Sequence, residues 1–451
     1  MERILDLKIA LWAVILMAVL GIIAVVAFGA AVLDGERGTK RFGAVAEAAV
    51  AVAEIPDTVK RMLGPDERLT IYKSERYDDK PTGWTLPAGK PWGLSGYILM
   101  SRYDGTRQHH VVELLSLEDW EVAYRWLPDG GELLHDAART SAFADYGNWN
   151  SQYFRAIHPV LEPNGDLIVK DHFSPLVRVD ACGRRVWIND SQMFHHSTEV
   201  DADGNLWLPS LAEPHTIRRV RDDFFEDKVT EVSPDGTVLF EKSVAQMLLD
   251  SGRDWMIFTN GEYRYDPMHL NDVEPALEDG PYWKKGDVFL SLRNISTIVQ
   301  YRPSTDEVIW TKSGPWMAQH DVDILDDHRI AIYDNNAQMR GTGTFVEDSS
   351  EIMVYDFSTG QVASPLRNAM RENGIKTLFA GLFSALPGGF SLIEDVTEAR
   401  FLLLSPDGKV AADFVNRAED GRIYHLGWSR FVDKAFGDNV LTQIKKVNCN
   451  E

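Results

Sequence analysis

Residues 229–242 read VTEVSPDGTVLFEK, and the pattern in this stretch recurs along the chain. Two runs that alternate between apolar and polar residues flank Pro234-Asp-Gly236, where glycine supplies the positive φ that a tight turn needs. The stretch therefore predicts a β-hairpin. Five further stretches share this form, at 111–126, 176–189, 298–312, 352–365 and 401–414.

A second series of hairpins interleaves with the first along the chain. It occupies 157–169, 196–208, 269–292, 320–332, 383–393 and 425–440. Two hairpins make one four-stranded antiparallel sheet, so six pairs predict an all-β protein, a six-bladed β-propeller. A β-sandwich or a barrel is the alternative architecture. Helical periodicity is scarce, with 244–249 as a short exception.

The two series are offset by one hairpin at each end of the chain. The hairpin at 111–126 has no partner before it, and the one at 425–440 has no partner after it. We expect these two to pair, because a ring closed by strands from both ends leaves no open sheet edge. The strand at 96–101 is left over in this count.

Composition narrows the class of protein further. The 451 residues are 44% hydrophobic and 25% charged, which is typical of a globular chain. A formal net charge of -22 argues against nucleic-acid binding, which needs a basic face. Two cysteines and no Cys-x-x-Cys exclude a disulfide-rich scaffold, a cysteine-based zinc site and a thioredoxin-like redox site.

The N-terminal segment 9–33 contains no charged residue. As a helix it would be about 37 Å long at ~1.5 Å per residue, enough to cross a bilayer core. We therefore expect one N-terminal transmembrane helix at 9–33 within a membrane anchor at 1–41. A stalk at 42–90 and the propeller domain at 91–451 would follow. A buried core helix and a cleaved signal peptide are the alternatives, although the apolar part of a signal is usually shorter.

A histidine recurs at the start of the inner hairpins. The pattern His-x-x-acid-aliphatic begins at His196, His269 and His320. Innermost strands of a propeller line its central channel, so these three side chains are expected to converge near one mouth of the channel. Arg293 lies on the strand after His269 and is expected at the same mouth. The alternative is a packing role for each histidine and a salt bridge for the arginine.

Three imidazoles and a guanidinium suit the transfer of an oxyanionic group. A neutral imidazole is a nucleophile and a proton carrier near neutral pH. The planar donors of Arg293 match the oxygens of a sulfuryl or phosphoryl group, and a second imidazole can protonate the leaving oxygen. Three histidines could also bind zinc or copper, but Arg293 at the same mouth would oppose a cation, so no metal is expected.

Four motifs resemble the arylsulfotransferase family, whose members transfer sulfate groups without a nucleotide donor. They occur in the family's order at 266–271 (DPMHLN), 290–294 (LSLRN), 314–321 (GPWMAQHD) and 333–336 (YDNN). The resemblance covers about 90–445 and is strongest over 195–336. It implies an exported six-bladed propeller that needs no cofactor. Its reaction would pass a sulfuryl group from an aryl sulfate to a phenol through a sulfated histidine.

The resemblance also implies roles for individual residues. His320 matches the nucleophile, and His269 and Arg293 match the groups that bind the sulfuryl oxygens and assist the leaving group. The first histidine of the family falls in Phe194-His195-His196, where the blade register favours His196 and leaves His195 open. Substrate binding is expected from His195, Asn271, Asn294, Trp316 and Tyr333, with Tyr265 and Trp283 as further aromatic candidates.

Some features depart from the family. Soluble periplasmic members carry a cleaved signal, whereas this chain is expected to keep its anchor, with the propeller on the extracytoplasmic side. It lacks a closely spaced cysteine pair, and we do not expect Cys182 to pair with Cys449, because the carboxyl terminus would have to fold back to the second blade. The expected partners are an aryl sulfate, a phenol and the membrane, with no nucleic acid. The sequence does not predict the oligomeric state.

Two other functions remain as alternatives. The first is a non-catalytic, membrane-tethered propeller that acts as a binding or scaffold protein. The second is a pyrroloquinoline-quinone dehydrogenase, whose repeat is similar to residues 303–310, but those enzymes need more blades than the six counted here.

Overall fold

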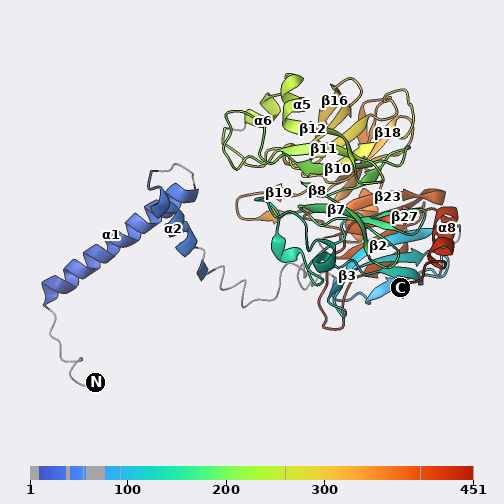
Figure 1. Cartoon of the computed structure of the whole chain (residues 1–451), viewed down its shortest axis with the longest axis horizontal. Helices are drawn as coiled ribbons and strands as arrows, with labels where there is room; N and C mark the ends of the chain where they lie inside the picture. The colour runs from blue at the N-terminus through green and yellow to red at the C-terminus, as the bar shows by residue number, and fades with distance from the viewer. Residues whose placement is uncertain are drawn as a thin grey trace. The chain divides into compact units, whose positions relative to one another are not determined.

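The computed structural model describes residues 10–36, 41–53, 55–56, 77–91, 93–259, 261–396 and 398–449 (Figure 1). The chain divides into two units, Met1–Glu67 and Arg68–Glu451. The first contains helices, and the second is an all-β, propeller-like unit with a few short helices.

The N-terminal unit contains α1 (Leu11–Glu36) and α2 (Ala44–Ala53). The two helices pack closely at Gly35, where a Cβ atom would lie 2.6 Å from Val50. Within α1, residues Leu11–Gly35 are long and apolar enough to cross a membrane, by length and composition. Such a helix near the N-terminus is either a membrane anchor or a signal sequence.

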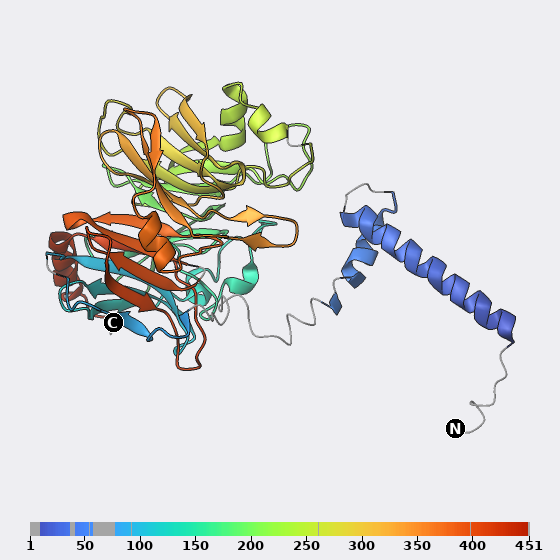
Figure 2. The same ribbon diagram turned by 180° about the vertical axis from the view of Figure 1, so that it is seen from behind.

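The second unit consists of antiparallel sheets, which Figure 2 shows from the far side. One contains β27 (Arg430–Val432), β2 (Tyr97–Asp104), β3 (His109–Ser116) and β4 (Val122–Trp126). The next contains β13 (Leu270–Pro275), β14 (Val288–Leu292), β15 (Thr297–Arg302) and β16 (Glu307–Ser313). A third contains β17 (Val322–Ile324), β18 (Arg329–Asp334), β21 (Glu351–Asp356) and β22 (Gln361–Ala363).

Two sheets are larger than four strands. The five-stranded sheet contains β23 (Leu382–Leu386), β24 (Phe390–Asp395), β25 (Arg400–Leu404), β26 (Val410–Val415) and β1 (Gly83–Thr85). The eight-stranded sheet contains β5 (Val160–Leu161), β6 (Leu167–Val169), β7 (Ser174–Val179), β8 (Arg185–Phe194), β9 (Glu199–Val200), β10 (Leu206–Leu211), β11 (Asp227–Val232) and β12 (Val238–Ser243). A separate ribbon contains β19 (Gln338–Met339) and β20 (Thr344–Phe345).

Short helices lie between these strands and after the last of them. They are α4 (Gly130–Leu133), η3 (Tyr146–Asn148), α5 (Val244–Asp250), α6 (Trp255–Phe258), η4 (Arg293–Ile295), α7 (Arg367–Glu372), η5 (Pro387–Gly389) and α8 (Lys434–Ile444). Helix α5 is the short helix that the sequence predicted at 244–249. Apolar side chains fill the spaces between neighbouring sheets, so the core is a series of clusters. One of them joins β10 and β11 to β13–β15 and α5.

The sheets differ from six separate four-stranded units. Strand β8 continues to Phe194, which pairs both with Ser174 of β7 and with Ser210 of β10, and this single contact joins two groups of four strands. Strand β1 lies in the segment expected as a stalk, yet it pairs with β26. The β unit therefore begins before residue 91.

The expected closure by both ends of the chain is present. Strand β27 pairs with β2, which in turn pairs with β3, so the leftover strand is the second strand of the closing sheet. The expected hairpin at 425–440 is wrong, because β27 is followed by α8. Asp433 caps this helix through the N–H of Ala435 at 2.8 Å. Gly437 serves close packing instead of a turn, since a Cβ atom there would lie 2.3 Å from the Tyr97 ring.

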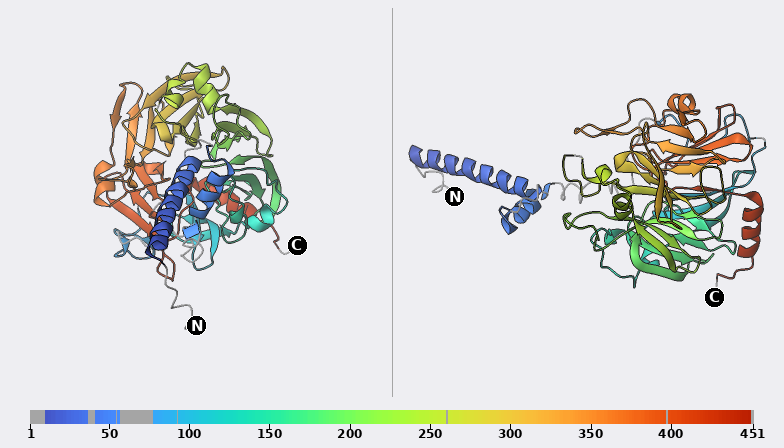
Figure 3. Two further views of the ribbon diagram at one scale, coloured as in Figure 1. Left: turned by 90° about the vertical axis from the view of Figure 1, so that its left-hand side faces the viewer. Right: turned by 90° about the horizontal axis from the view of Figure 1, so that it is seen from above.

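A disulfide joins Cys182 to Cys449 with a Cα–Cα distance of 5.3 Å. Our expectation that these cysteines stay unpaired was wrong. Helix α8 packs against the β unit through Val440 and Ile444, and Ile444 contacts Gly165 in the turn between β5 and β6. The terminus thus folds back to this side of the β unit, where the turn between β7 and β8 contains Cys182. Figure 3 shows α8, coloured dark red, along the outside of the strands.

Candidate active site

A left-handed residue precedes several innermost strands and turns the chain into them. His196 has φ 49° before β9, His269 has φ 56° before β13, and Ala318 has φ 53° before β17. Such φ values are unusual for residues other than glycine and are often found at functional sites. Ala318, two residues before His320, therefore occupies the place in its blade that His196 and His269 occupy in theirs. His320 lies two residues further along the chain than that place, although the sequence pattern aligns the three histidines.

His196 and three other imidazoles form a cluster. The ring centroid of His196 is 5.0 Å from that of His269, 5.0 Å from His195 and 4.6 Å from His172. The Nδ1 atoms of His195 and His196 are 2.7 Å apart, so one of them donates a proton to the other. Both members of the His195–His196 pair therefore belong to the cluster, and His196 faces His269.

His195 lies on the buried side of this cluster. Its ring packs near Phe173 and Phe225, and burial lowers its pKa well below the usual range, with His269 adding to the effect. Its Nε2 lies 3.3 Å from Oδ1 of Asp227, without hydrogen-bond geometry. Burial raises the pKa of Asp227 well above its ordinary value, and Asp266 raises it further.

His269 is oriented by a carboxylate. Its Nδ1 lies 2.5 Å from Oδ2 of Asp266, three residues earlier in the chain. A histidine that donates its Nδ1 proton to a carboxylate keeps Nε2 free as a base, or as an acid once protonated. The Asp266–His269 pair can therefore handle the proton of a leaving or attacking oxygen.

Arg293 begins η4, immediately after β14, and its backbone N–H donates to the carbonyl of His269 at 3.1 Å. The residue is 7% exposed. Its Nη1 donates to Oδ1 of Asn294 at 2.8 Å, and its Nε has no hydrogen-bond partner. The guanidinium carbon lies 5.7 Å from the centre of the Phe379 ring. Within the described ranges Arg293 forms no ion pair, although buried cations are normally paired.

His320 is held at both ring nitrogens and is 3% exposed. Nδ1 lies 2.7 Å from Oδ1 of Asn335, and Nε2 accepts the N–H of Ala380 at 2.9 Å. Burial holds the pKa of His320 well below its usual range, and the charge of Arg293 lowers it further. The imidazole is therefore neutral at physiological pH. His269 also contributes to lowering this pKa, so His320, Arg293 and His269 share one electrostatic environment.

The expected substrate-binding residues separate into two groups. Asn271 and Asn294 bridge parts of the site, since Asn271 donates to the Gln319 carbonyl at 3.1 Å and Asn294 donates to the Asp266 carbonyl at 2.8 Å. Trp316 and Tyr333 are each only 1% exposed and belong to core clusters. These two rings therefore pack among core residues, and their contact with substrate stays a prediction.

Two acidic residues that follow the histidines have a structural role. Oδ2 of Asp272 accepts the N–H of Val322 on the next sheet at 3.0 Å, and Oδ2 of Asp321 accepts the N–H of Phe383 at 2.8 Å. Burial, followed by the charge of Glu199, raises the pKa of Asp272 to about 7. These carboxyls connect successive innermost strands.

Sequence reasoning missed His172, Asp227 and the role of Asn335. His172 follows Asp171 in the turn between β6 and β7 and shares no sequence pattern with the other histidines. Its contacts with His196 assign it to the cluster, since the two rings lie 4.6 Å apart and the backbone N–H of His196 donates to Nδ1 of His172 at 3.4 Å.

A pocket of about 960 Å³ lies at the end of β8, and the four imidazoles of the cluster are not among its lining residues. Apolar side chains in its wall include Phe143, Met193 and Phe224. The ring of Phe225 connects the two places, since it lies 5.0 Å from the Phe143 ring and 5.9 Å from the His195 ring. The pocket is large enough for a small aromatic molecule.

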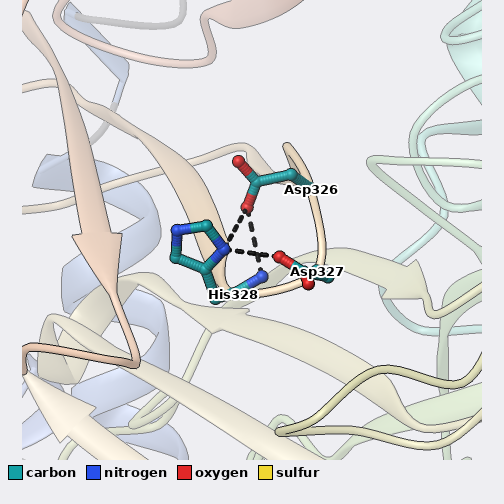
Figure 4. A group of neighbouring side chains, drawn as sticks. All are labelled: Asp326, Asp327 and His328. Carbon is teal, nitrogen blue, oxygen red and sulfur yellow. Dashed lines mark hydrogen bonds and ion pairs between the residues drawn. The ribbon is translucent and has the colours of Figure 1, made fainter.

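Asp326, Asp327 and His328 form a group with possible metal-ligand spacing in the turn between β17 and β18 (Figure 4). Their polar atoms are already used within the turn. Oδ1 of Asp326 accepts the N–H of His328 at 3.1 Å, and Oδ1 of Asp327 lies 2.5 Å from Nδ1 of His328. The group is a hydrogen-bonded surface turn.

The β unit is thus an all-β, propeller-like unit with buried histidines and an arginine that forms no ion pair within the described ranges. The sequence model of the family described as Arylsulfotransferase (ASST) matches residues 158–417, more than half of the chain. The protein therefore belongs to the arylsulfotransferase family. The matched range contains all four of the expected catalytic residues. A search of the curated proteins finds no match to this chain.

Solved structures with similarity to the chain have low sequence identity. A protein of unknown function from Bacteroides caccae is 10% identical with a TM-score of 0.47, covering 75% of this chain and 99% of that one. The WD40 β-propeller domain of Doa1 is 13% identical with a TM-score of 0.39, covering 77% and 95%. Virginiamycin B lyase from Staphylococcus aureus is 10% identical with a TM-score of 0.34, covering 58% and 70%.

Proposed function

We propose that this protein is an aryl-sulfate sulfotransferase that works through a sulfated His320. It would take the sulfuryl group from an aryl sulfate and pass it to a phenol without a nucleotide donor. The observation that carries the proposal is the buried guanidinium of Arg293, which lacks an anionic partner in the described part of the chain. A sulfate ester would supply the missing anion beside a neutral imidazole.

The residues suggest one order of steps. The lone pair of Nε2 of His320 attacks sulfur, the N–S bond forms, and the S–O bond to the aryl group breaks. The electron pair of that bond leaves with the aryl oxygen, which takes a proton from His269, and Asp266 stabilises His269 when it is charged. Arg293 donates to the sulfuryl oxygens as the S–O bond breaks. The acceptor phenol reverses these steps, giving its proton to His269.

The pocket at the end of β8 supports binding of an aromatic substrate. Its apolar wall suits an aryl ring, and Phe225 links it to the histidine cluster. We assign this pocket to the aryl part of the donor or acceptor, in place of the buried Trp316 and Tyr333.

We also propose that the β unit is a six-bladed propeller. The eight-stranded sheet then counts as two blades, β5–β8 and β9–β12, because only the Phe194–Ser210 pair and no longer ladder joins β8 to β10. A left-handed residue precedes the innermost strand of each proposed blade, and these six are His158, His196, His269, Ala318, Ala380 and Trp428.

We propose that residues 1–41 anchor the protein, that 42–90 form a connection including β1, and that the propeller lies on the extracytoplasmic side. The disulfide between Cys182 and Cys449 supports this location, because disulfides persist in oxidising compartments.

The test uses the full chain purified in detergent, with 4-nitrophenyl sulfate as donor and phenol as acceptor. Release of 4-nitrophenol and formation of phenyl sulfate are expected, together with a sulfated peptide containing His320 by mass spectrometry. His320→Ala should remove both products while the circular dichroism spectrum is kept. A folded wild-type protein that is inactive with a broad donor panel would contradict the proposal.

A second candidate is a non-catalytic binding propeller on the membrane. The observation that favours it is the closed state of His320, whose Nε2 is covered by the N–H of Ala380. Purification of a stable membrane complex without turnover would support this candidate.

A further inference from the structure

Asn335 follows β18 directly and is fully buried. Its amide group is used completely. Oδ1 lies 2.7 Å from Nδ1 of His320, while Nδ2 donates to the carbonyl oxygens of Ala380 at 2.7 Å and Thr377 at 3.0 Å. The side chain therefore touches both His320 and the turn that leads into β23.

This network fixes the orientation of the amide. An amide nitrogen has two protons to donate, and both are directed to backbone carbonyls. The flipped amide would place its oxygen against the oxygens of Thr377 and Ala380, with no proton between them. Oδ1 must therefore face His320, and an oxygen that carries no proton can only accept.

The tautomer of His320 follows from these contacts. Because Oδ1 of Asn335 accepts, the proton lies on Nδ1, which is also 3.1 Å from the carbonyl of Ala318. The opposite nitrogen gives the same answer independently, since Nε2 lies 2.9 Å from the N–H of Ala380 and must accept from it. His320 is thus the Nδ1–H tautomer with its lone pair on Nε2.

We propose that Asn335 is a positioning residue that directs sulfuryl transfer to Nε2 of His320 and holds the Thr377–Ala380 turn over that nitrogen in the resting protein. The assignment of the reaction rests on the proposed function, whereas the tautomer and the turn do not. The hydrogen bond from Ala380 uses the lone pair that attacks sulfur, so it breaks before the N–S bond forms. The Thr377–Ala380 turn therefore has to give way to the donor.

The proton balance explains why an amide occupies this position. When Nε2 takes the sulfuryl group and the aryl oxygen leaves with its electron pair, Nδ1 keeps its proton and the ring becomes a positively charged sulfoimidazolium. Asn335 accepts from that proton but does not remove it. A ring that stays charged is a good leaving group for the second transfer, from Nε2 to the phenol. A carboxylate at position 335 would instead make the imidazole more basic and stabilise the charged ring.

The experiment compares the wild type, Asn335→Ala, Asn335→Asp and the control Asn336→Ala as full chains in detergent. Asn336 is the neighbouring amide, but its side chain donates to the carbonyl of Ser349 and does not touch His320. Long-range proton–nitrogen correlation spectra of histidine-labelled protein report the tautomer, and His320→Gln assigns the signal. Initial rates with 4-nitrophenyl sulfate and phenol report kcat and KM.

The wild-type spectrum should show a protonated Nδ1 and an unprotonated Nε2 at His320. Asn335→Ala should give a mixture of tautomers and lower kcat by about 10²–10⁴-fold with little change in KM, as expected for a misdirected catalytic imidazole. Asn335→Asp should raise the titration midpoint of His320 by at least about one pH unit. Asn336→Ala should match the wild type in each measurement.

A protonated Nε2 in the wild type would overturn the proposal even if no variant folds. An unchanged tautomer and kcat in Asn335→Ala, or an unchanged titration in Asn335→Asp, would also overturn it. A wild type with the expected tautomer but without sulfate transfer would refute the proposed function and leave the orientation by Asn335 intact.

Discussion

Replacing Arg293 by methionine should remove activity without lowering stability. Most buried arginines are paired, and losing one leaves a buried carboxylate without its partner. Arg293 differs, because it is 7% exposed and its only side-chain hydrogen bond in the described chain goes to Asn294 at 2.8 Å. Its burial is therefore a cost to the fold that a bound anion would offset.

The structure gives the sign and size of the change in stability. Removing a buried unpaired cation relieves a desolvation penalty of several kcal/mol. Against this stand the hydrogen bond to Asn294, about 1.5–3 kcal/mol, and the contact with the Phe379 ring, about 0.5–1 kcal/mol. The free energy of unfolding should stay level or rise by up to about 2 kcal/mol. For a domain of this size that is a Tm rise of about 0–3 °C.

The effect on activity should be large and opposite. Loss of preorganised donors to the developing charge lowers kcat/KM by about 10²–10³-fold. Arg293→Lys should recover little, because a lysine cannot reproduce the planar pair of donors. Rates are measured with 4-nitrophenyl sulfate, and Tm by intrinsic fluorescence of the detergent-solubilised chain.

Arg302→Met is the matched control. Arg302 lies on β15, which pairs with β14, the strand directly before Arg293. Arg302 forms two bonds of 2.7 Å to the buried carboxylate of Asp287. Its loss should destabilise the protein by about 2–4 kcal/mol and leave the activity of the folded protein unchanged. If Arg293→Met instead loses stability as Arg302→Met does and keeps its activity, Arg293 is a structural residue and the reasoning is refuted.

Three further predictions concern other parts of the molecule. Cys182→Ser should lower Tm, because a disulfide that joins residues 267 positions apart typically stabilises a protein by about 2–4 kcal/mol. The loss of chain entropy in the unfolded state sets an upper value of about 5.6 kcal/mol. Equal Tm values with and without reductant would contradict this prediction. Since burial holds the pKa of His320 well below its usual range, single-turnover sulfation should not slow when the pH falls from 7.5 to 6.0, and a loss with a midpoint near pH 6.5 would show a normal imidazole. Membrane-extracted protein should retain its first residues by intact mass, whereas a mass lacking the segment up to about residue 31 would identify a cleaved signal.

The hairpins were predictable because their signals are local. The turn at Pro234-Asp-Gly236 connects β11 to β12 as the sequence indicates, and Gly236 has the expected positive φ of 90°. Alternation of apolar and polar residues determines which side chains face the core, and turn residues determine where strands end. The family motifs likewise select Arg293 and the histidines as site residues, and their catalytic roles stay predictions. By contrast, Gly437 reads as a turn residue, yet it lies in α8 because the Tyr97 ring needs the space.

Local patterns in the amino-acid sequence predict an all-β chain with repeated hairpins, one apolar N-terminal helix and a set of histidines with one arginine. The packing of the sheets, in contrast, brings Cys182 to Cys449 and His172 to the cluster, buries Trp316 in the core and places Asn335 against His320. Strand periodicity and turn chemistry act between neighbours in the chain. Contacts among these side chains depend instead on how whole sheets pack, and on positions far apart in sequence that no local pattern relates.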